Sequence, residues 1–233
     1  MDLLAIETAT PRVSVAFGAD GCVRGEVALE GSRRHAEQLA PAIEYLRGET
    51  GCSLDGVAAV AVGIGPGLFT GLRVGVTTAR VIAQTLRVPA IGVPTLDLVA
   101  YPVRHSDRLI VAIVDARRRE VFSARYRSVP GGLQRIGEYE VGPADAIACE
   151  LEASREEALL VGDGALAYRD RFRHLDRVEI GGPGNARPSI GALVELATAR
   201  YAREEFCRPE ALEPLYLRRS DAEIAWDRAE ASW

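Results

Sequence analysis

The sequence predicts an α/β layered fold with mixed β-sheets, on three observations. The short apolar stretch Val57–Val62 is typical of a buried strand and leads through a glycine-rich loop into a helix. In that helix, Phe69–Leu86, apolar residues recur at steps of three and four, which is the period of one helix face. The chain opens with a strand, a hairpin and further strands, and a similar opening begins again at Leu109.

In the first half, three antiparallel strands precede two units of strand and helix. Asp20-Gly21 favours a tight hairpin between the second and third strands, because both residues tolerate positive φ. The helix that follows has an apolar face formed by Leu39, Ile43 and Leu46. The other expected elements are strands Leu3–Ile6, Val13–Phe17, Cys22–Leu29 and Val88–Val93, and a helix from Ser32 to Gly48.

A polar boundary near Tyr101–Asp107 separates the second half, in which strands come first and helices later. The pattern divides the chain into residues 1–102, residues 103–220 and a charged tail, 221–233. The last helix of the second unit starts after Ser189 and can pack back onto the first unit. The expected elements are strands Leu109–Val114, Val121–Tyr126, Leu133–Val141, Leu159–Val161 and Arg177–Ile180, and helices Ala144–Leu151 and Ala165–Phe172.

The composition indicates a globular protein with a substantial core. Of 233 residues, 48% are apolar, and the net charge of −5 gives no general attraction to nucleic acid or to anionic membranes. All basic residues other than histidine are arginine, which removes lysine-based chemistry. The four cysteines are scattered without a Cys-x-x-Cys pair, which argues against structural zinc. With no apolar segment of roughly 20 residues, the expected setting is the cytoplasm.

The glycine-rich loop Gly63–Gly71 has two interpretations. Such loops often bind phosphate, because glycine allows close approach and a helix N-terminus presents free N–H groups. This loop lacks the Lys-Ser/Thr ending of a P-loop and the glycine spacing of a dinucleotide fingerprint. The local sequence therefore favours a tight turn between strand and helix.

The helix after this loop is apolar on more than one side, which favours burial on two sides. Off its first apolar face lie Val74, Val81 and Ile82. Gly71 and Gly75 are one turn apart and would let another backbone come close. A polar stripe contains Arg73, Thr77 and Arg80. This stripe is either a solvated edge or the rim of a protein interface, and the pattern leaves both open.

Candidate chemical groups cluster at two strand ends. Glu7, Thr8 and Thr10 follow the first strand, and Asp115 ends the first strand of the second half. Glu7 and Asp115 are placed to face each other across a cleft between the halves, as acid–base or metal-holding carboxylates, or simply to satisfy turns. The run Arg117–Arg119 is expected at a solvated hairpin tip, where its charge would suit an RNA phosphate.

Five segments, in this order, resemble the TsaB (YeaZ) family over nearly the whole chain. They are Ile6-Glu7-Thr8-Ala9, His35-Ala36-Glu37-Gln38-Leu39, Gly65-Pro66-Gly67-Leu68-Phe69-Thr70-Gly71-Leu72-Arg73, Val114-Asp115-Ala116-Arg117 and Pro214-Leu215-Tyr216-Leu217-Arg218. The resemblance implies the actin-like ATPase (ASKHA) fold with two RNase-H-like lobes. It also implies a scaffold or activator subunit that supports TsaD in transferring threonylcarbamoyl to the adenosine beside the anticodon of tRNA.

The resemblance implies further partners and no cofactor on this chain alone. ATP and metal are expected on partner subunits: TsaD carries a metal-binding histidine pair, and TsaE is an ATPase that joins through the TsaB–TsaD complex. A homodimer is expected when the chain is alone, with only indirect contact to tRNA and none to membrane. Ala9 stands where actin-like ATPases have a phosphate-binding glycine, and Leu68 where the family often has serine, which weakens a phosphate-binding role.

The resemblance also places the interface with TsaD, or with a second copy, on the helices of the first lobe. The predicted interface residues are Leu39, Ile43, Leu46, Phe69, Leu72, Arg73, Gly75, Val76, Thr77, Ala79, Arg80 and Ala83. Two alternative functions are a stand-alone nucleotide-binding enzyme of the actin-like ATPase superfamily and a metal-independent peptidase. The nucleotide-binding enzyme would use Glu7, Thr8, Thr10 and Asp115 around a phosphate.

Overall fold

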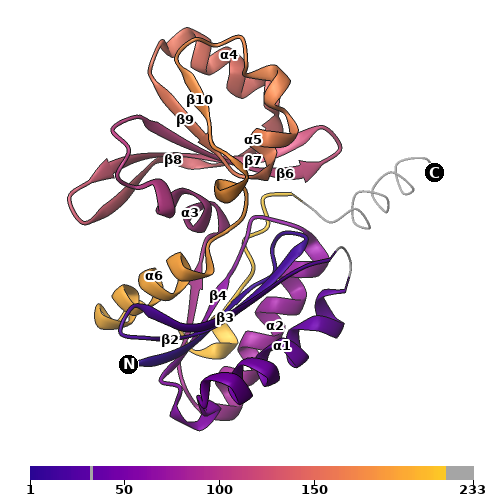
Figure 1. The fold of residues 1–233 in the computed structure, drawn as a ribbon, viewed down its shortest axis with the longest axis vertical. Helices are drawn as coiled ribbons and strands as arrows, with labels where there is room; N and C mark the ends of the chain where they lie inside the picture. Colours follow the sequence, from indigo (N-terminus) through magenta and orange to yellow (C-terminus); the bar gives the residue numbers. More distant parts are fainter. Residues whose placement is uncertain (32–33, 219–233) are drawn as a thin grey trace.

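The computed structural model describes residues 1–31 and 34–218, which form two lobes, one above the other in Figure 1. The predicted helix start at Ser32 and the predicted charged tail, 221–233, lie outside the described residues. Each lobe is built on a five-stranded mixed sheet. In the described ranges, no helix has both the length and the apolar character needed to cross a membrane.

The sheet of the first lobe has the order β3-β2-β1-β4-β5. β1, β2 and β3 are antiparallel neighbours, whereas β4 lies parallel to β1 and β5 parallel to β4. Ala5 pairs with Ala16 on one side and with Ala61 on the other, which puts β1 at the centre. The elements are β1 (Asp2–Glu7), β2 (Arg12–Ala19), β3 (Cys22–Glu30), α1 (His35–Thr50), β4 (Ala59–Gly63), α2 (Phe69–Leu86) and β5 (Ala90–Val93).

The sheet of the second lobe has the order β10-β9-β6-β7-β8. β6, β7 and β8 are antiparallel neighbours, β9 lies parallel to β6, and β10 lies parallel to β9. The remaining elements are α3 (Thr95–Ala100), β6 (Leu109–Arg117), β7 (Glu120–Val129), β8 (Gly132–Pro143), α4 (Ala144–Ser154), β9 (Ala158–Val161), α5 (Asp163–Ala167), β10 (Val178–Ile180) and α6 (Ile190–Ala202). Short 3-10 helices cover Leu54–Gly56, Tyr101–Val103, Arg169–Arg171, Pro183–Asn185 and Pro209–Ala211.

The two sheets repeat one topology. In each, three consecutive antiparallel strands are followed by two parallel strands on the other side of the first strand. This is the arrangement expected of two RNase-H-like lobes. The repeated strand–hairpin opening in the sequence corresponds to the three antiparallel strands of each sheet. The α/β class with mixed sheets is confirmed.

Helices cover both faces of the first sheet, and the alternation of side chains along β1 shows how. Leu4 and Ile6 point into a core shared with α1 and α2. Leu3 and Ala5 point to the opposite face, where they pack against α6. Because apolar residues alternate to both faces, β1 has a continuous apolar run, as a fully buried strand requires.

The second sheet is covered by α4 and α5 on one face and by α3 on the other. Val111 belongs to the core with α4 and α5, whereas Ile110 belongs to the core with α3. The last helix of each half of the chain therefore packs on the sheet of the other half. α3 precedes β6 and packs on the second sheet, while α6 follows β10 and packs on the first.

Most expected elements appear within a few residues of their expected ends, and α2 has the expected bounds, Phe69–Leu86. One helix is shorter than predicted. The helix expected at Ala165–Phe172 ends at Ala167 and gives way to a 3-10 turn, because Tyr168 leaves the helical region with φ −109° and ψ 20°. This break turns Phe172 into the core of the second lobe, where it is fully buried.

Candidate functional site

The β1–β2 connection holds the carboxyl group of Glu7 inside the first lobe. The Ala9 backbone N–H donates to one carboxyl oxygen at 2.6 Å, and the Thr95 hydroxyl donates to the other at 3.5 Å. Gly63 packs directly against this group, since a Cβ atom there would overlap it. Glu7 is only 1% exposed, and this burial outweighs the hydrogen bonds and raises the pKa of Glu7 to about 7.

Thr8 fastens the same connection to the first turns of α2. Its hydroxyl donates to the carbonyl of Gly71 at 2.8 Å. A Cβ atom at Gly71 would overlap the Thr8 carbonyl, and one at Gly75 would overlap the Thr8 hydroxyl. The two helix glycines do admit a neighbouring backbone, but that backbone is the first loop of the same chain.

Thr10 lies at the end of this connection and is also buried. Its carbonyl contacts Nε2 of His35 at 2.8 Å, and His35 is the first residue of α1. The loop is thus tied to β4, α1 and α2 at once. The polar residues Glu7, Thr8 and Thr10 serve these internal contacts, and among them only Thr10 lines the space between the lobes.

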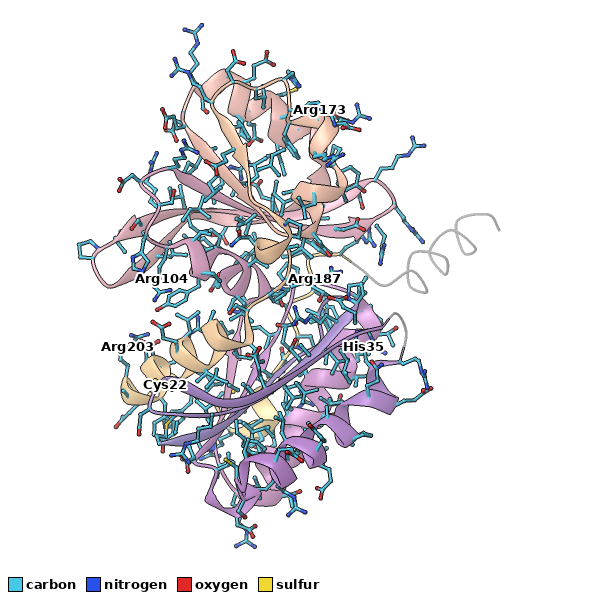
Figure 2. The ribbon with its side chains drawn as sticks, viewed as in Figure 1. Cys22, His35, Arg104, Arg173, Arg187 and Arg203 are labelled. Atoms are coloured by element: carbon cyan, nitrogen blue, oxygen red, sulfur yellow. The ribbon has the colours of Figure 1, made fainter. Side chains whose placement is uncertain are left out.

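A cleft of about 190 Å³ separates the lobes. It is lined by Ala9, Thr10, Pro11, Leu68, Val114, Asp115, Arg117, Asp163, Ala167 and Arg187. Arg187, which lies between the lobes in Figure 2, donates to Asp163 at 2.7 Å and to Glu30 of β3 at 3.2 Å. This bridge joins the two lobes through one guanidinium group.

Asp115 lines the cleft, but Glu7 does not face it from the other side, because the Glu7 carboxyl group is buried beneath the first loop. Asp115 forms an ion pair with Arg117 at 3.2 Å, and its backbone N–H donates to Asp163 at 3.0 Å. Burial raises the pKa of Asp163. Asp163 and Arg187 were not predicted; the only sequence signal is the glycine turn Gly162-Asp163-Gly164.

The cleft is therefore a small space in which two arginines are paired with carboxylates. Its volume of about 190 Å³ is below the range of roughly 300–1,000 Å³ that is usual for small-molecule sites. Among residues 1–31 and 34–218, no group of three or more His, Cys, Asp or Glu side chains is arranged to hold a metal ion.

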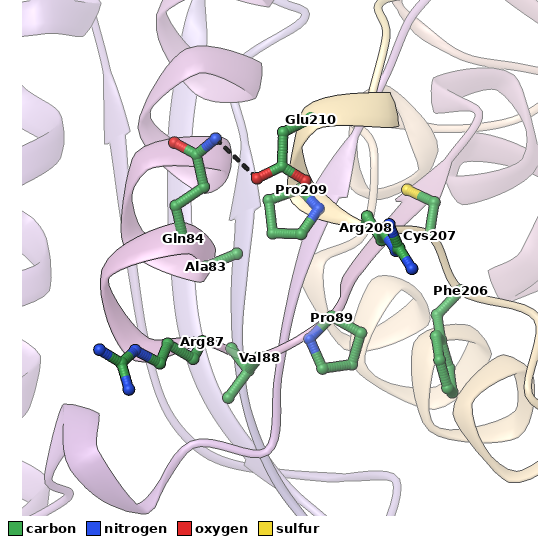
Figure 3. Close-up of a pocket in the computed structure, with 10 residues that line it drawn as sticks. All are labelled: Ala83, Gln84, Arg87, Val88, Pro89, Phe206, Cys207, Arg208, Pro209 and Glu210. Atoms are coloured by element: carbon green, nitrogen blue, oxygen red, sulfur yellow. Dashed lines mark hydrogen bonds between the residues drawn. The ribbon is translucent and has the colours of Figure 1, made fainter.

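A larger pocket, about 460 Å³, lies on the first lobe between the end of α2 and residues 206–210 (Figure 3). Its lining includes Val88, Pro89 and Phe206, which give it an apolar floor. Gln84 and Glu210 close one side through a hydrogen bond of 3.1 Å. Sequence reasoning did not find this pocket, because its walls are more than 100 residues apart in the chain.

Most of the predicted interface residues belong instead to the core of the first lobe. The buried ones are Leu39, Ile43, Leu46, Leu72, Gly75, Val76, Ala79 and Ala83. Their side chains meet the first sheet, the first loop or, for Leu72, the glycine loop before α2, and this is why α1 and α2 have these faces. A partner cannot contact these side chains while the lobe is folded.

The other four predicted interface residues lie on accessible parts of α2 and have different surroundings. Arg73 and Thr77 are exposed, and Phe69 and Arg80 are partly buried. Arg80 donates to the carbonyl of Leu212, so it fastens the later chain to α2. Only Phe69, Arg73 and Thr77 thus remain as parts of an accessible surface.

Each of α1 and α2 also carries a large apolar side chain that is exposed. Tyr45 of α1 is 60% exposed and Val81 of α2 is 53% exposed, and they are the most exposed large apolar side chains in the described part of the chain. The two helices lie side by side over one face of the first sheet (Figure 1). Tyrosine is enriched at protein interfaces, so this exposed face is a candidate interaction surface.

Comparison with known proteins gives closely consistent results. Residues 23–226 match the family model described as TsaD, tRNA N6-adenosine threonylcarbamoyltransferase. The chain is 31% identical to the tRNA threonylcarbamoyladenosine biosynthesis protein TsaB of Escherichia coli (strain K12), with 98% of both chains covered. It is 30% identical to the TsaB of Bacillus subtilis (strain 168), with 97% of this chain and 98% of the relative covered.

Solved structures agree with this result. YeaZ from Pseudomonas aeruginosa superposes with a TM-score of 0.80 at 29% identity, over 93% of this chain and 99% of that one. The ethanolamine utilization protein EutJ from Carboxydothermus hydrogenoformans, at 10% identity and a TM-score of 0.51, shares the fold alone. The predicted actin-like ATPase fold with two RNase-H-like lobes is confirmed. With two relatives at least 30% identical over nearly its full length, the chain belongs to the TsaB (YeaZ) family.

Proposed function

We propose that this chain is a non-catalytic subunit that supports a TsaD enzyme in transferring threonylcarbamoyl to the adenosine beside the anticodon of tRNA. Family membership supports this function, since the relatives are named for tRNA threonylcarbamoyladenosine biosynthesis. The matching family model, described as the transferase itself, supports a shared ancestry with the proposed partner. In this proposal ATP and metal bind to partner subunits, and TsaE joins through the TsaB–TsaD complex.

The observation that carries the proposal is the exposed pair Tyr45 and Val81 on neighbouring helices. These side chains keep more than half of their surface in water, and a partner that covers both would remove apolar area from solvent. Tyrosine is enriched among residues that dominate binding energy. TsaD, or a second copy of this chain when TsaD is absent, is the proposed cover for this face.

The internal role of Glu7 and the small cleft weigh against a stand-alone nucleotide-binding enzyme. Glu7 and Thr8 are committed to contacts within the first lobe, and the cleft has a volume of about 190 Å³. Neither residue is available to a phosphate unless the first loop leaves α2. No geometry in the described ranges favours the peptidase alternative.

The test is co-elution of the purified chain with TsaD from the same organism, measured by size-exclusion chromatography with light scattering. The parent chain should form a complex of one copy of this chain with one TsaD. Val81→Arg should weaken the complex at least about tenfold, because it places a charge on the proposed contact surface. Ile136→Arg is the matched control, since Ile136 is 39% exposed on β8 of the other lobe and should not affect assembly. Equal affinity of both variants for TsaD would contradict the proposed face.

A further inference from the structure

Three consecutive arginines form the turn between β6 and β7, and all three have left-handed backbones. The φ angles are 63° at Arg117, 55° at Arg118 and 67° at Arg119. Arg117 pairs with Glu120 across the hairpin, so Arg118 and Arg119 are the two connecting residues. A two-residue turn with positive φ at both positions favours Asn-Gly or Asp-Gly, because other side chains adopt this conformation less readily.

The β2–β3 hairpin of the same chain uses the favoured residues. The two-residue turn between β2 and β3 is Asp20-Gly21, with φ angles of 52° and 81°. The arginines of the β6–β7 turn are therefore not explained by the backbone that they occupy. Residues held in unfavourable backbone regions concentrate at functional sites. We therefore look for a function of the guanidinium groups in this turn.

The arginine turn is exposed and lies at the mouth of the cleft between the lobes. All three residues are exposed, and Arg117 lines the cleft. The β6–β7 hairpin projects from the right of the second lobe in Figure 1, on the same side as α1 and α2. On a chain with a net charge of −5, this is a local concentration of positive charge. Guanidinium groups bind phosphate oxygens in a bidentate manner.

An exposed aromatic side chain, Tyr216, packs on α2 two residues before the chain contacts the same hairpin through Arg218. Tyr216 is 43% exposed, and its ring lies 5.1 Å from that of Phe69, over which Arg73 stacks at 4.0 Å. Two residues later, Arg218 binds Glu120, which directly follows the arginine turn, at 2.7 Å. Aromatic faces stack on unpaired bases, and arginines contact the backbone that joins them.

We propose that the turn Arg117–Arg119 binds phosphates of tRNA and that Tyr216 stacks on an unpaired base or sugar of the same molecule. This inference rests on the proposed function, which brings tRNA to the complex. A single-stranded RNA loop offers both phosphates and unstacked bases, whereas an acidic protein surface offers only the charge. The inference is a direct contact between this chain and tRNA, whereas the net charge led us to expect only an indirect one. Local charge, and not net charge, decides where a polyanion binds.

The variant that tests the turn is Arg118→Asn with Arg119→Gly, because it removes two charges and installs the residues that the turn favours. The control is Arg171→Ser with Arg173→Ser, which changes the net charge equally. Figure 2 shows Arg173 near the far end of the second lobe. Fluorescence anisotropy with a labelled, unmodified tRNA transcript gives affinities of the full chain, alone and with TsaD, between about 50 and 200 mM salt.

The turn variant should bind the transcript roughly tenfold more weakly and reduce the slope of log affinity against log salt by about one to two. Tyr216→Ala should weaken binding without changing that slope, since it removes no charge. Unchanged affinity and slope in the turn variant, or an equal loss in the control, would overturn the inference.

Assembly with TsaD is measured for the same proteins. Loss of TsaD binding in the turn variant would show that the turn contacts protein, which also overturns the inference. If the parent chain does not bind TsaD but binds the transcript through Arg118 and Arg119, the proposed function fails while the RNA contact stands. The two failures are thus distinguishable.

Discussion

Replacing Glu7 with glutamine should remove a pH dependence of stability that comes from one buried carboxyl group. Burial raises the pKa of Glu7 from 4.5 to about 7 in the folded chain. Between these values the unfolded chain has lost a proton that the folded chain keeps, so the free energy of unfolding falls as the pH rises. The difference in pKa corresponds to about 3 kcal/mol, fully expressed above about pH 7.

Urea unfolding between about pH 5 and pH 8 measures this effect. The parent chain should lose about 2.5 kcal/mol relative to Glu7→Gln across this range, because glutamine stays neutral and can still accept the Ala9 N–H. Glu26→Gln on β3 is the control, since Glu26 is exposed and should leave the curve of the parent unchanged. Parallel curves for the parent and Glu7→Gln would refute the assignment of a raised pKa to Glu7.

Two further predictions concern packing in the first lobe and hydrogen bonding in the second. Gly75→Ala should lower the free energy of unfolding by about 1–3 kcal/mol because its Cβ atom would overlap the Thr8 hydroxyl. Gly48→Ala should raise it by about 0.5–1 kcal/mol, since nothing lies within 4 Å of its Cβ position and alanine favours the helix. Effects of the same sign in urea unfolding would contradict this reasoning. Asp97→Ala removes the carboxylate to which two tyrosine hydroxyls donate at 2.8 Å, so it should lower the free energy of unfolding by about 2–3 kcal/mol. An unchanged Tm would count against Asp97 as a stabilising acceptor.

The elements were largely predictable because their signals are local. α2 was placed at Phe69–Leu86 from its apolar period, and the structure has the same bounds. The Asp20-Gly21 turn followed from the tolerance of both residues for positive φ, and both have it. The glycine loop before α2 is a turn held by its own chain: the Gly65 N–H contacts the Thr95 hydroxyl at 3.2 Å, and the Leu68 N–H donates to the Ala9 carbonyl at 2.7 Å.

The surface of α2 was not predictable in the same way, because an apolar stripe does not reveal what covers it. Val76, Ala79 and Ala83 were assigned to a partner interface, yet they pack against the first sheet. Val81 was recognised only as a residue off the main stripe, and it is 53% exposed. Deciding between the two faces needs the position of the sheet, which comes from contacts distant in sequence.

The candidate site was predicted in part for the same reason. Asp115 lies near the end of β6 and lines the cleft, as strand-end residues often do. Glu7 also ends a strand, but Ala9, Gly63 and Thr95 enclose it. The contact between Glu7 and Thr95 spans 88 residues, so no local pattern announces it.

The most direct test of the proposed function is a reconstituted transfer reaction. TsaD and its ATP-dependent partners are incubated with unmodified tRNA, with or without this chain, and threonylcarbamoyl-adenosine is quantified after digestion of the tRNA. We predict that product forms only when TsaD and this chain are both present, and that Val81→Arg reduces it in proportion to the lost complex. Full activity of TsaD without this chain, or product from this chain without TsaD, would contradict the proposal that it is a non-catalytic supporting subunit.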